Sequence, residues 1–231
     1  SSALGNTVSR VIESGTDDMG RWSYIKLSGT EGKTITFITV YQVCKKPSTP
    51  ADKDSCTAHW QQRSLLIQQN KSDPNPIKHF RQDLDRFLST CYSKQELLVL
   101  FGDFNKVYGS DSAGISKLAR KFELLDIMHQ SHQLADPATY ARGKPRIDYI
   151  LSSAPVFQSV NSCGYETFNE HFLSDHRGYF VDFDYQKLFG NELQRLESLP
   201  FRDVRGKDKT SVTQYVEAKD AYLDEHKFYP R

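Results

Sequence analysis

The sequence predicts a layered α/β domain, and three of its features support this prediction. Stretches with the composition of strands alternate with stretches of helical composition, and the connections between them are long. The continuous apolar run 97–101 is bounded by Gly102, as is typical of a buried strand. Acidic and amide side chains follow that run directly, where open α/β sheets place their reactive groups.

The N-terminal part of the chain predicts a β-hairpin. Residues 22–27 alternate polar and apolar side chains, and residues 34–43 are rich in β-branched residues. Residues 28–33 contain two glycines and are expected to connect these strands. Residues 1–20 show little periodicity, and within them residues 14–20 have the composition of a turn-rich loop.

Three helices are predicted around the central apolar strand. The composition of residues 57–70 switches to helix-forming residues. Apolar side chains then recur at helical spacing between Phe80 and Cys91, and again over residues 115–131. Each of these segments would present one apolar face to a sheet.

Two further strands are expected to complete the main domain, at residues 146–152 and 178–184. Beyond Gly190, two helical segments follow, the second of which keeps one apolar face. We therefore divide the chain into a main domain, residues 1–188, and a helical C-terminal extension or linker, residues 189–231.

Composition excludes several classes of protein. The net charge of +1 and the pI of about 7.7 are not those of a dedicated nucleic-acid binder, so any polyanion must contact local clusters of cations. No apolar run reaches membrane-spanning length, so no membrane partner is expected. The four cysteines contain no CxxC pair, which argues against a zinc knuckle.

Cysteine usage also bears on the compartment. Cys44 and Cys56 flank a loop and could form a disulfide, but free thiols are favoured. We therefore expect a reducing, intracellular location, nuclear or cytoplasmic. The chain begins at Ser1 without a signal-like segment, and we expect it to be part of a longer protein.

A set of motifs resembles the endonuclease/exonuclease/phosphatase superfamily, which has the DNase I-like fold. The resemblance covers residues 21–185, and residues 20–24 and 41–44 look most like endonuclease domains associated with reverse transcriptases in mobile elements. A fused reverse transcriptase domain in the parent chain is therefore an expected partner. The motifs that carry the resemblance are, in chain order, Thr39-Val40-Tyr41, Gly102-Asp103-Phe104-Asn105, Thr139-Tyr140, Arg146-Ile147-Asp148-Tyr149-Ile150-Leu151 and Ser174-Asp175-His176.

The resemblance implies a fold and a chemistry. The fold is a four-layer α/β sandwich, with two facing mixed sheets flanked by helices and the active site at one edge. The chemistry is hydrolysis of a phosphodiester or phosphomonoester by a water molecule that Mg²⁺, or alternatively Mn²⁺, activates. DNA is the expected substrate.

One departure from the family pattern concerns its first strands. Family members carry an upstream strand with an Asn and a second strand ending in Gln-Glu, whose Glu is a principal metal ligand. Nothing in residues 1–20 matches either strand, and Glu13 lies in no strand-like pattern. We therefore expect the N-terminal strands to be absent from this chain and its metal affinity and activity to be weak.

The resemblance also assigns roles to individual residues. Asp148 and His176 would form a catalytic pair, in which the acid fixes the tautomer of the imidazole. Asp103 would be either the water-activating base or a metal-side carboxylate, and Asn105 would hold the phosphate. The alternative for the last two is a turn at a strand end.

Two further residues receive roles with simpler alternatives. Asp175 resembles the second metal-side acid of the family, although it could equally be a residue at a strand boundary. Tyr41 would donate a hydrogen bond to the phosphate, although tyrosine is common in any strand.

Four cations are candidates for binding substrate phosphates. They are Arg142, Lys144 and Arg146, which precede Asp148 closely, and Arg177, which follows His176. The alternative for the first three is a solvated basic loop.

The leading interpretation is thus a metal-dependent DNA endonuclease. A second interpretation keeps the fold but changes the substrate to a lipid or inositol head group. A third is a catalytically dead fragment that retains only interactions.

Overall fold

The computed structural model describes residues 10–44, 57–109, 114–133, 136–169, 173–190 and 208–225. Contacts divide the chain into two units, Ser1–Leu193 and Gln194–Arg231. Cys56 and the first of the two helical segments expected beyond Gly190 lie outside the described residues. No described helix is both long and apolar enough to cross a membrane.

The second unit contains helix α8 (Lys209–Glu225), which agrees with the later helical segment expected from the sequence. The domain boundary after residue 188 stays a prediction. Phe189, one residue beyond it, is buried in the core of the first unit.

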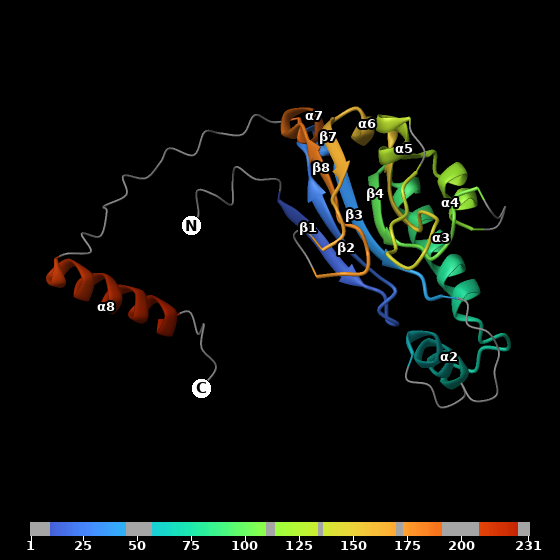
Figure 1. Cartoon of the computed structure of the whole chain (residues 1–231), viewed down its shortest axis with the longest axis horizontal. Coiled ribbons are helices and arrows are strands. Elements are labelled where there is room, and N and C mark those ends of the chain that lie inside the picture. The colour runs from blue at the N-terminus through green and yellow to red at the C-terminus, as the bar shows by residue number, and fades with distance from the viewer. Residues whose placement is uncertain are drawn as a thin grey trace. The chain divides into compact units, whose positions relative to one another are not determined.

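A six-stranded mixed sheet forms the centre of the first unit (Figure 1). Its order is β1-β2-β3-β4-β6-β5, and all neighbours are antiparallel except the parallel pair β3 and β4. The strands are β1 (Val11–Thr16), β2 (Trp22–Ser28), β3 (Thr34–Tyr41), β4 (Leu97–Asp103), β5 (Leu124–Asp126) and β6 (Asp148–Ser153), and the turn between β2 and β3 contains the short 3-10 helix η1 (Thr30–Gly32).

A second sheet of two antiparallel strands, β7 (Val160–Tyr165) and β8 (Tyr179–Phe183), faces the first. Phe183 of β8 meets Phe37 of β3 edge-on, with ring centroids 6.4 Å apart. The short helices α6 (Ala154–Phe157) and α7 (Tyr185–Phe189) supply Val156 and Leu188 to the same apolar cluster. The predicted architecture of two facing sheets with flanking helices is therefore confirmed.

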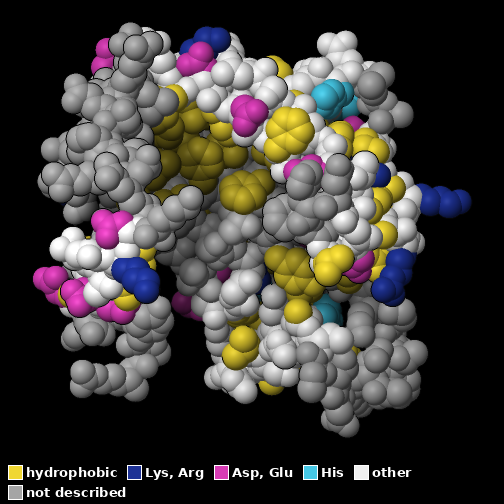
Figure 2. Space-filling view, turned by 60° about the vertical axis from the view of Figure 1, so that its left-hand side comes forward, with side chains coloured by type: hydrophobic (Ala, Val, Ile, Leu, Met, Phe, Trp, Pro, Cys, Tyr) yellow, Lys and Arg dark blue, Asp and Glu magenta, His cyan; other side chains and the backbone are white. Residues whose placement is uncertain are grey.

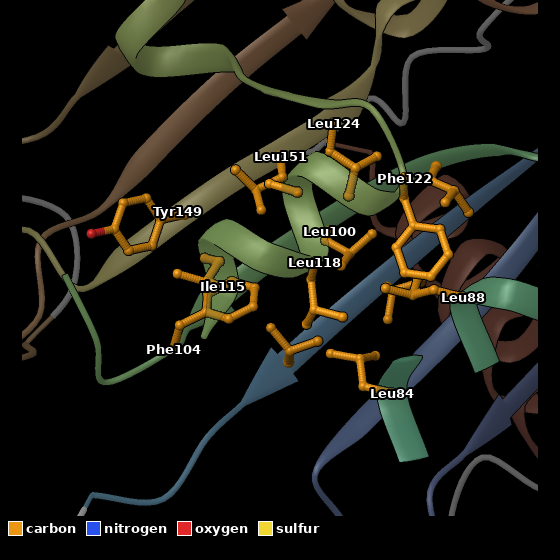
Figure 3. Close-up of a cluster of buried hydrophobic side chains, with 14 of the residues drawn as sticks. Leu84, Leu88, Leu100, Phe104, Ile115, Leu118, Phe122, Leu124, Tyr149 and Leu151 are labelled. Atoms are coloured by element: carbon orange, nitrogen blue, oxygen red, sulfur yellow. The ribbon is translucent and has the colours of Figure 1, made fainter. Parts of the chain in front are cut away.

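Helices α2 (Ala58–Gln68), α3 (Pro76–Ser93) and α4 (Ile115–Lys121) belong to the opposite side of the large sheet (Figure 1). Helix α3 begins with Pro76, whose fixed φ suits the first helical position, and the Asn75 side chain accepts a hydrogen bond from Lys78 N. Figure 3 shows Leu84 and Leu88 of α3 beside Leu100 of β4 in the main buried cluster. This packing is the amphipathic pattern that the sequence predicted.

The third predicted helix is wrong in its extent. Residues 115–131 form α4, then strand β5, then α5 (Ile127–His132). Glu123 adopts a positive φ of 52°, which breaks the helix, and Asp126 caps α5 by accepting a hydrogen bond from His129 N. The helical periodicity continued across this break because both helices and the strand bury one apolar side.

Strand β1 was not predicted, because residues 11–16 do not alternate in polarity. The strand lies at the edge of the sheet and forms by pairing with β2. The register shifts between Val11 and Glu13, as in a β-bulge.

The face of the large sheet that looks toward β7 and β8 is only partly covered. Ile25 and Phe101 lie on this face, opposite Phe37 and Ile150 in the strand register, and they remain 37% and 38% exposed. Figure 2, turned so that this side of the molecule comes forward, shows hydrophobic side chains gathered in a hollow. Exposed apolar area of this kind favours association with other apolar surfaces.

We expect Ile25→Thr and Phe101→Thr together to reduce 8-anilinonaphthalene-1-sulfonate fluorescence and self-association. Threonine keeps β-propensity, and half-exposed side chains contribute only about 1 kcal/mol each, so the fold should persist. Light scattering and dye fluorescence measure the effect. Leu173→Thr, at an isolated leucine that is 98% exposed, is the matched control. Equal dye binding by the double variant and the unchanged chain would contradict this account.

Candidate active site

Three candidate side chains are brought together by the strand register. Tyr41 of β3 is paired with Asp103 of β4, and Asp103 is paired with Asp148 of β6. Cross-strand neighbours in one row lie about 5 Å apart and project to the same side. The sheet itself therefore assembles these residues at the ends of its central strands, on the face that looks toward the second sheet.

Gly102 makes this row possible. Its φ is +138°, and a Cβ atom at this position would lie 2.0 Å from the carbonyl oxygen of Val40. Only glycine can adopt this backbone and this approach without a clash. Glycine is therefore required at position 102 by the backbone conformation, and its place in the sequence motif has a structural explanation.

His176 joins the row from the segment before β8. Its Nδ1 lies 3.2 Å and 3.1 Å from the two carboxylate oxygens of Asp148. An isolated bridge pairs His176 with Tyr140, and the two rings are 5.2 Å apart. The backbone N–H of His176 also donates to the Ser174 hydroxyl at 3.0 Å. The imidazole is therefore held on several sides.

Asp148 is fixed through its backbone. The hydroxyl of the fully buried Thr139 accepts hydrogen bonds from the N–H groups of Ile147 and Asp148, at 3.0 and 3.2 Å. The Tyr179 hydroxyl donates to the Asp148 carbonyl at 2.7 Å. These contacts are the local reason that the Asp148 carboxylate is aimed at His176.

Asn105 closes the other side of Asp103. Its N–H and its Nδ2 donate to the two Asp103 carboxylate oxygens at 2.7 and 2.8 Å. Nδ2 also donates to the Gln42 carbonyl at 2.7 Å, and Oδ1 accepts from Cys44 Sγ at 2.8 Å. The amide thus orients Asp103, and its proposed contact to a phosphate stays a prediction.

The electrostatics of Asp103 are unusual for an aspartate. Burial raises its pKa to about 6, and the nearby Asp148 charge adds to the rise, whereas the Asn105 N–H and His176 oppose it. The pKa of Tyr41 is also raised, by burial first and then by Cys44 and Asp103. A carboxylate that titrates near neutrality in a polar cluster is typical of functional sites.

The cluster can accommodate a cation. Asp103, Asp148 and His176 each offer a ligand atom, and these atoms lie within 4.8 Å of one another. Asp103 and Asp148 are cross-strand neighbours, so a cation between them would offset their mutual repulsion. Carboxylate oxygens are the ligands that hard divalent cations prefer, so the residues fit such an ion.

Asp175 does not belong to this cluster. It is exposed, and its printed contact is made by its backbone carbonyl, which accepts from Ala141 N at 2.8 Å. Its role as a second metal-side acid remains a proposal.

Comparison with known proteins identifies the fold. No protein-family model matches the chain, and no curated protein matches it. A 3′ phosphatase from Neisseria, solved with a product DNA hairpin, aligns with 76% of this chain and 72% of its own, at 18% identity and a TM-score of 0.53. A 3′–5′ exonuclease from Neisseria meningitidis gives the same coverage and TM-score at 19% identity. The chain has a DNase I-like fold.

An AP endonuclease from Archaeoglobus fulgidus supports this assignment, with a TM-score of 0.50, 16% identity and the same shares of both chains. The fold predicted from the motifs is therefore confirmed. In the DNase I-like fold of this chain, the candidate cluster lies where the central strand β4 ends and β6 begins, next to the second sheet.

Two of the predicted phosphate-binding cations have other partners. Arg146 is 3% exposed, forms ion pairs with Asp126 and Asp136 and stacks over Tyr149. It is therefore an interior structural residue, and its assignment to a phosphate is corrected. Arg177 donates to the carbonyls of Ala138 and Glu166, at 3.1 and 3.0 Å, which ties β8 to the 138–139 segment.

The two remaining cations of the predicted set, Arg142 and Lys144, are exposed. They follow Tyr140, whose backbone bridges to His176. Their contact with substrate stays a prediction.

Glu13 is placed away from the cluster. It accepts a hydrogen bond from the Tyr24 hydroxyl at 2.6 Å and pairs with Lys26 at 3.0 Å. Lys26 also pairs with the buried Glu96. Tyr24 packs against the helix-side core, so Glu13 is on the opposite face from Asp103.

Three positioning residues received no role from the sequence: Gln42, Thr139 and Tyr179. Thr139 lies in a motif that carried the family resemblance, but a single threonine gives no signal of which amides it contacts. Tyr179 fits the alternating pattern of strand β8, and nothing in the sequence distinguishes its hydroxyl from that of any other tyrosine in a strand.

Proposed function

We propose that this chain is a metal-dependent phosphodiester hydrolase acting on DNA as an endonuclease. The observation that carries the proposal is the cluster of Asp103, Asp148 and His176 at the strand ends of a DNase I-like sheet. Such a reaction needs a base for water, neutralisation of phosphoryl charge and support for the leaving oxygen. Asp103 is the candidate base, a cation held by the carboxylates would neutralise phosphoryl charge, and His176 would support the leaving oxygen.

Asp103 is the proposed base. A pKa of about 6 leaves it mostly ionised at neutral pH while keeping it basic enough to accept a proton. Water attacks phosphorus, its proton passes to Asp103, a new P–O bond forms, and the bond to the leaving oxygen breaks.

His176 is the proposed partner of the phosphoryl group. Because Nδ1 faces the Asp148 carboxylate, Nε2 is the nitrogen that can donate to a phosphoryl or leaving oxygen. Asp148 fixes the tautomer and stabilises the imidazolium form, and Thr139 keeps Asp148 in place.

Asp103 and Asp148, with Asp175 as a further candidate, would hold Mg²⁺ or Mn²⁺, which supplies positive charge beside the phosphoryl oxygens when bound. Asp103 would serve either this ion or the attacking water, since both of its oxygens already accept hydrogen bonds from Asn105. Tyr41, Arg142 and Lys144 are the proposed contacts to substrate phosphates.

DNA is proposed because the Neisseria and Archaeoglobus structures are described as a 3′ phosphatase bound to a DNA hairpin, an exonuclease and an AP endonuclease. We also propose that the chain comes from the endonuclease part of a mobile element with a fused reverse transcriptase and acts in the nucleus or cytoplasm. The motif resemblance supports the first of these two points, and the expectation of free cysteines supports the second.

The test compares substrates under one set of conditions. The unchanged chain is incubated with Mg²⁺ and either supercoiled plasmid or phosphoinositide vesicles, and nicked circles and released phosphate are quantified. We expect weak nicking that EDTA abolishes and no release of lipid phosphate. Release of phosphate from lipid without nicking would assign the site to a head-group phosphatase instead.

A further inference from the structure

A basic groove lies on the helix side of the first unit, formed by α2, the loop before α3, the N-terminal half of α3, the segment after β4, and α4. Its volume is about 930 Å³. Six cations line it: Arg63, Lys78, Arg81, Lys106, Lys117 and Lys121. This site is distinct from the Asp103–Asp148–His176 cluster.

The groove concentrates positive charge in a nearly neutral chain. Among the residues that the structure describes, its six cations face two carboxylates, Asp73 and Asp85, whereas the chain as a whole has a net charge of +1. Each carboxylate is already paired, Asp73 with Lys78 at 2.8 Å and Asp85 with Lys121 at 2.6 Å. Arg63, Lys106 and Lys117 therefore give the groove an excess of positive charge among the described residues.

The excess comes from different elements. Arg63 is on α2, Lys106 follows strand β4, which carries Asp103, and Lys117 is on α4. Within the part of the chain that the structure describes, no carboxylate pairs with any of these three. Cations spread along a groove match a ligand with repeated negative charges rather than one phosphate.

A chain of hydrogen bonds through the buried Gln42 connects the groove with the candidate active site. The guanidinium Nε of Arg81, in the groove, donates to Gln42 Oε1 at 3.3 Å. Gln42 Nε2 donates to the Phe104 carbonyl at 2.6 Å, and the Gln42 carbonyl accepts from Asn105 Nδ2 at 2.7 Å. Lys106 directly follows Asn105. One wall of the groove thus adjoins the residues that orient Asp103.

We propose that this groove binds the sugar–phosphate backbone of a nucleic acid that extends from the scissile phosphate. The proposal rests on the proposed function, and it specifies a polymer as substrate rather than a small phosphate ester. The backbone would lie against Lys106 and run along the cations of the groove toward Arg63 of α2. Binding here would be independent of base sequence, since phosphate contacts position a duplex without identifying its bases.

The experiment measures binding separately from hydrolysis. Full-length chain carrying His176→Ala, to prevent cleavage, is titrated into a fluorescein-labelled 30-base-pair duplex and a 30-nucleotide single strand at 50–200 mM KCl. The same titrations use a groove variant with Arg63→Gln, Lys106→Gln and Lys117→Gln added. A matched control instead carries Lys33→Gln, Lys94→Gln and Lys187→Gln, which removes the same charge from exposed positions outside the groove.

We expect the groove variant to bind the duplex at least tenfold more weakly at 100 mM salt. The slope of log K against log salt should fall in magnitude by about 2–3, since each lost phosphate contact contributes about 0.9. The control should change affinity less than twofold. The single change Lys117→Gln, at an exposed position, should give a slope change of about 1 and guards against misfolding of the triple variant.

Three results would overturn the inference: an unchanged salt slope in the groove variant, an equal loss in the control, or displacement of the duplex by poly-L-glutamate as effectively as by unlabelled DNA. The last result would assign the groove to acidic protein. Hydrolysis of bis(4-nitrophenyl) phosphate by the unchanged chain tests the proposed function by itself. Turnover of this diester with no groove effect would reject only the groove, and a groove effect without any hydrolysis would reject only the catalytic function.

Discussion

Asp148→Asn and His176→Ala should each reduce the rate of phosphodiester hydrolysis by about 10²–10⁴-fold, the usual contribution of a general acid–base group. The double variant should be no slower than the worse single variant. The reason is geometric: Asp148 lies 3.1 Å from His176 Nδ1, and loss of either residue disables the pair as a unit.

The measurement is a double-mutant cycle on kcat/KM with bis(4-nitrophenyl) phosphate. His129→Ala is the matched control, because His129 is 57% exposed and lies outside the cluster. Its rate should equal that of the unchanged chain. Losses that multiply in the double variant would show that Asp148 and His176 act independently.

Asp103→Asn should abolish hydrolysis and yet raise stability in EDTA at pH 7. The pKa of Asp103 is raised from 3.8 to about 6, so the folded state binds this proton more tightly than the unfolded state does. Ionised Asp103 therefore destabilises the fold, with no effect below pH 4, a growing effect between pH 4 and 6, and the full effect at pH 7. Removing the charge should increase the free energy of unfolding by about 1–3 kcal/mol.

Thermal unfolding with and without Mg²⁺ checks this prediction. In EDTA the variant should melt several degrees above the unchanged chain, and the difference should vanish near pH 4. Added Mg²⁺ should raise the Tm of the unchanged chain and leave that of the variant unaltered, since a ligand stabilises only the state that binds it. Asp182→Asn, at an exposed position of β8, is the control. A lower Tm for Asp103→Asn in EDTA would contradict the assigned electrostatics.

The sequence predicted most of the sheet because its central strands carry strong local signals. The apolar run 97–101, bounded by Gly102, was found where expected, and the β-branched strand predicted over residues 34–43 was found at Thr34–Tyr41. Strand β1 and the break at Glu123 were missed, because each depends on pairing with a neighbouring strand rather than on its own composition.

The site was predicted in part for a similar reason. Asp103, Asp148 and His176 lie in motifs at strand ends, where the register of the sheet brings them together. The burial of Arg146 was not predictable, because the sequence does not distinguish it from Arg142 and Lys144 in the same short segment. Its partners Asp126 and Asp136 are 20 and 10 residues away in sequence, and only the fold makes them neighbours.

The central claim is that the Asp103–Asp148–His176 cluster hydrolyses phosphodiesters. The most direct test is nicking of supercoiled plasmid in Mg²⁺ by the unchanged chain and by Asp103→Asn/His176→Ala, purified side by side. We predict nicked circles that accumulate slowly with the unchanged chain, disappear in EDTA and are absent with the double variant. Nicking at the same rate by both proteins, or none by the unchanged chain across Mg²⁺ and Mn²⁺ concentrations, would contradict the claim.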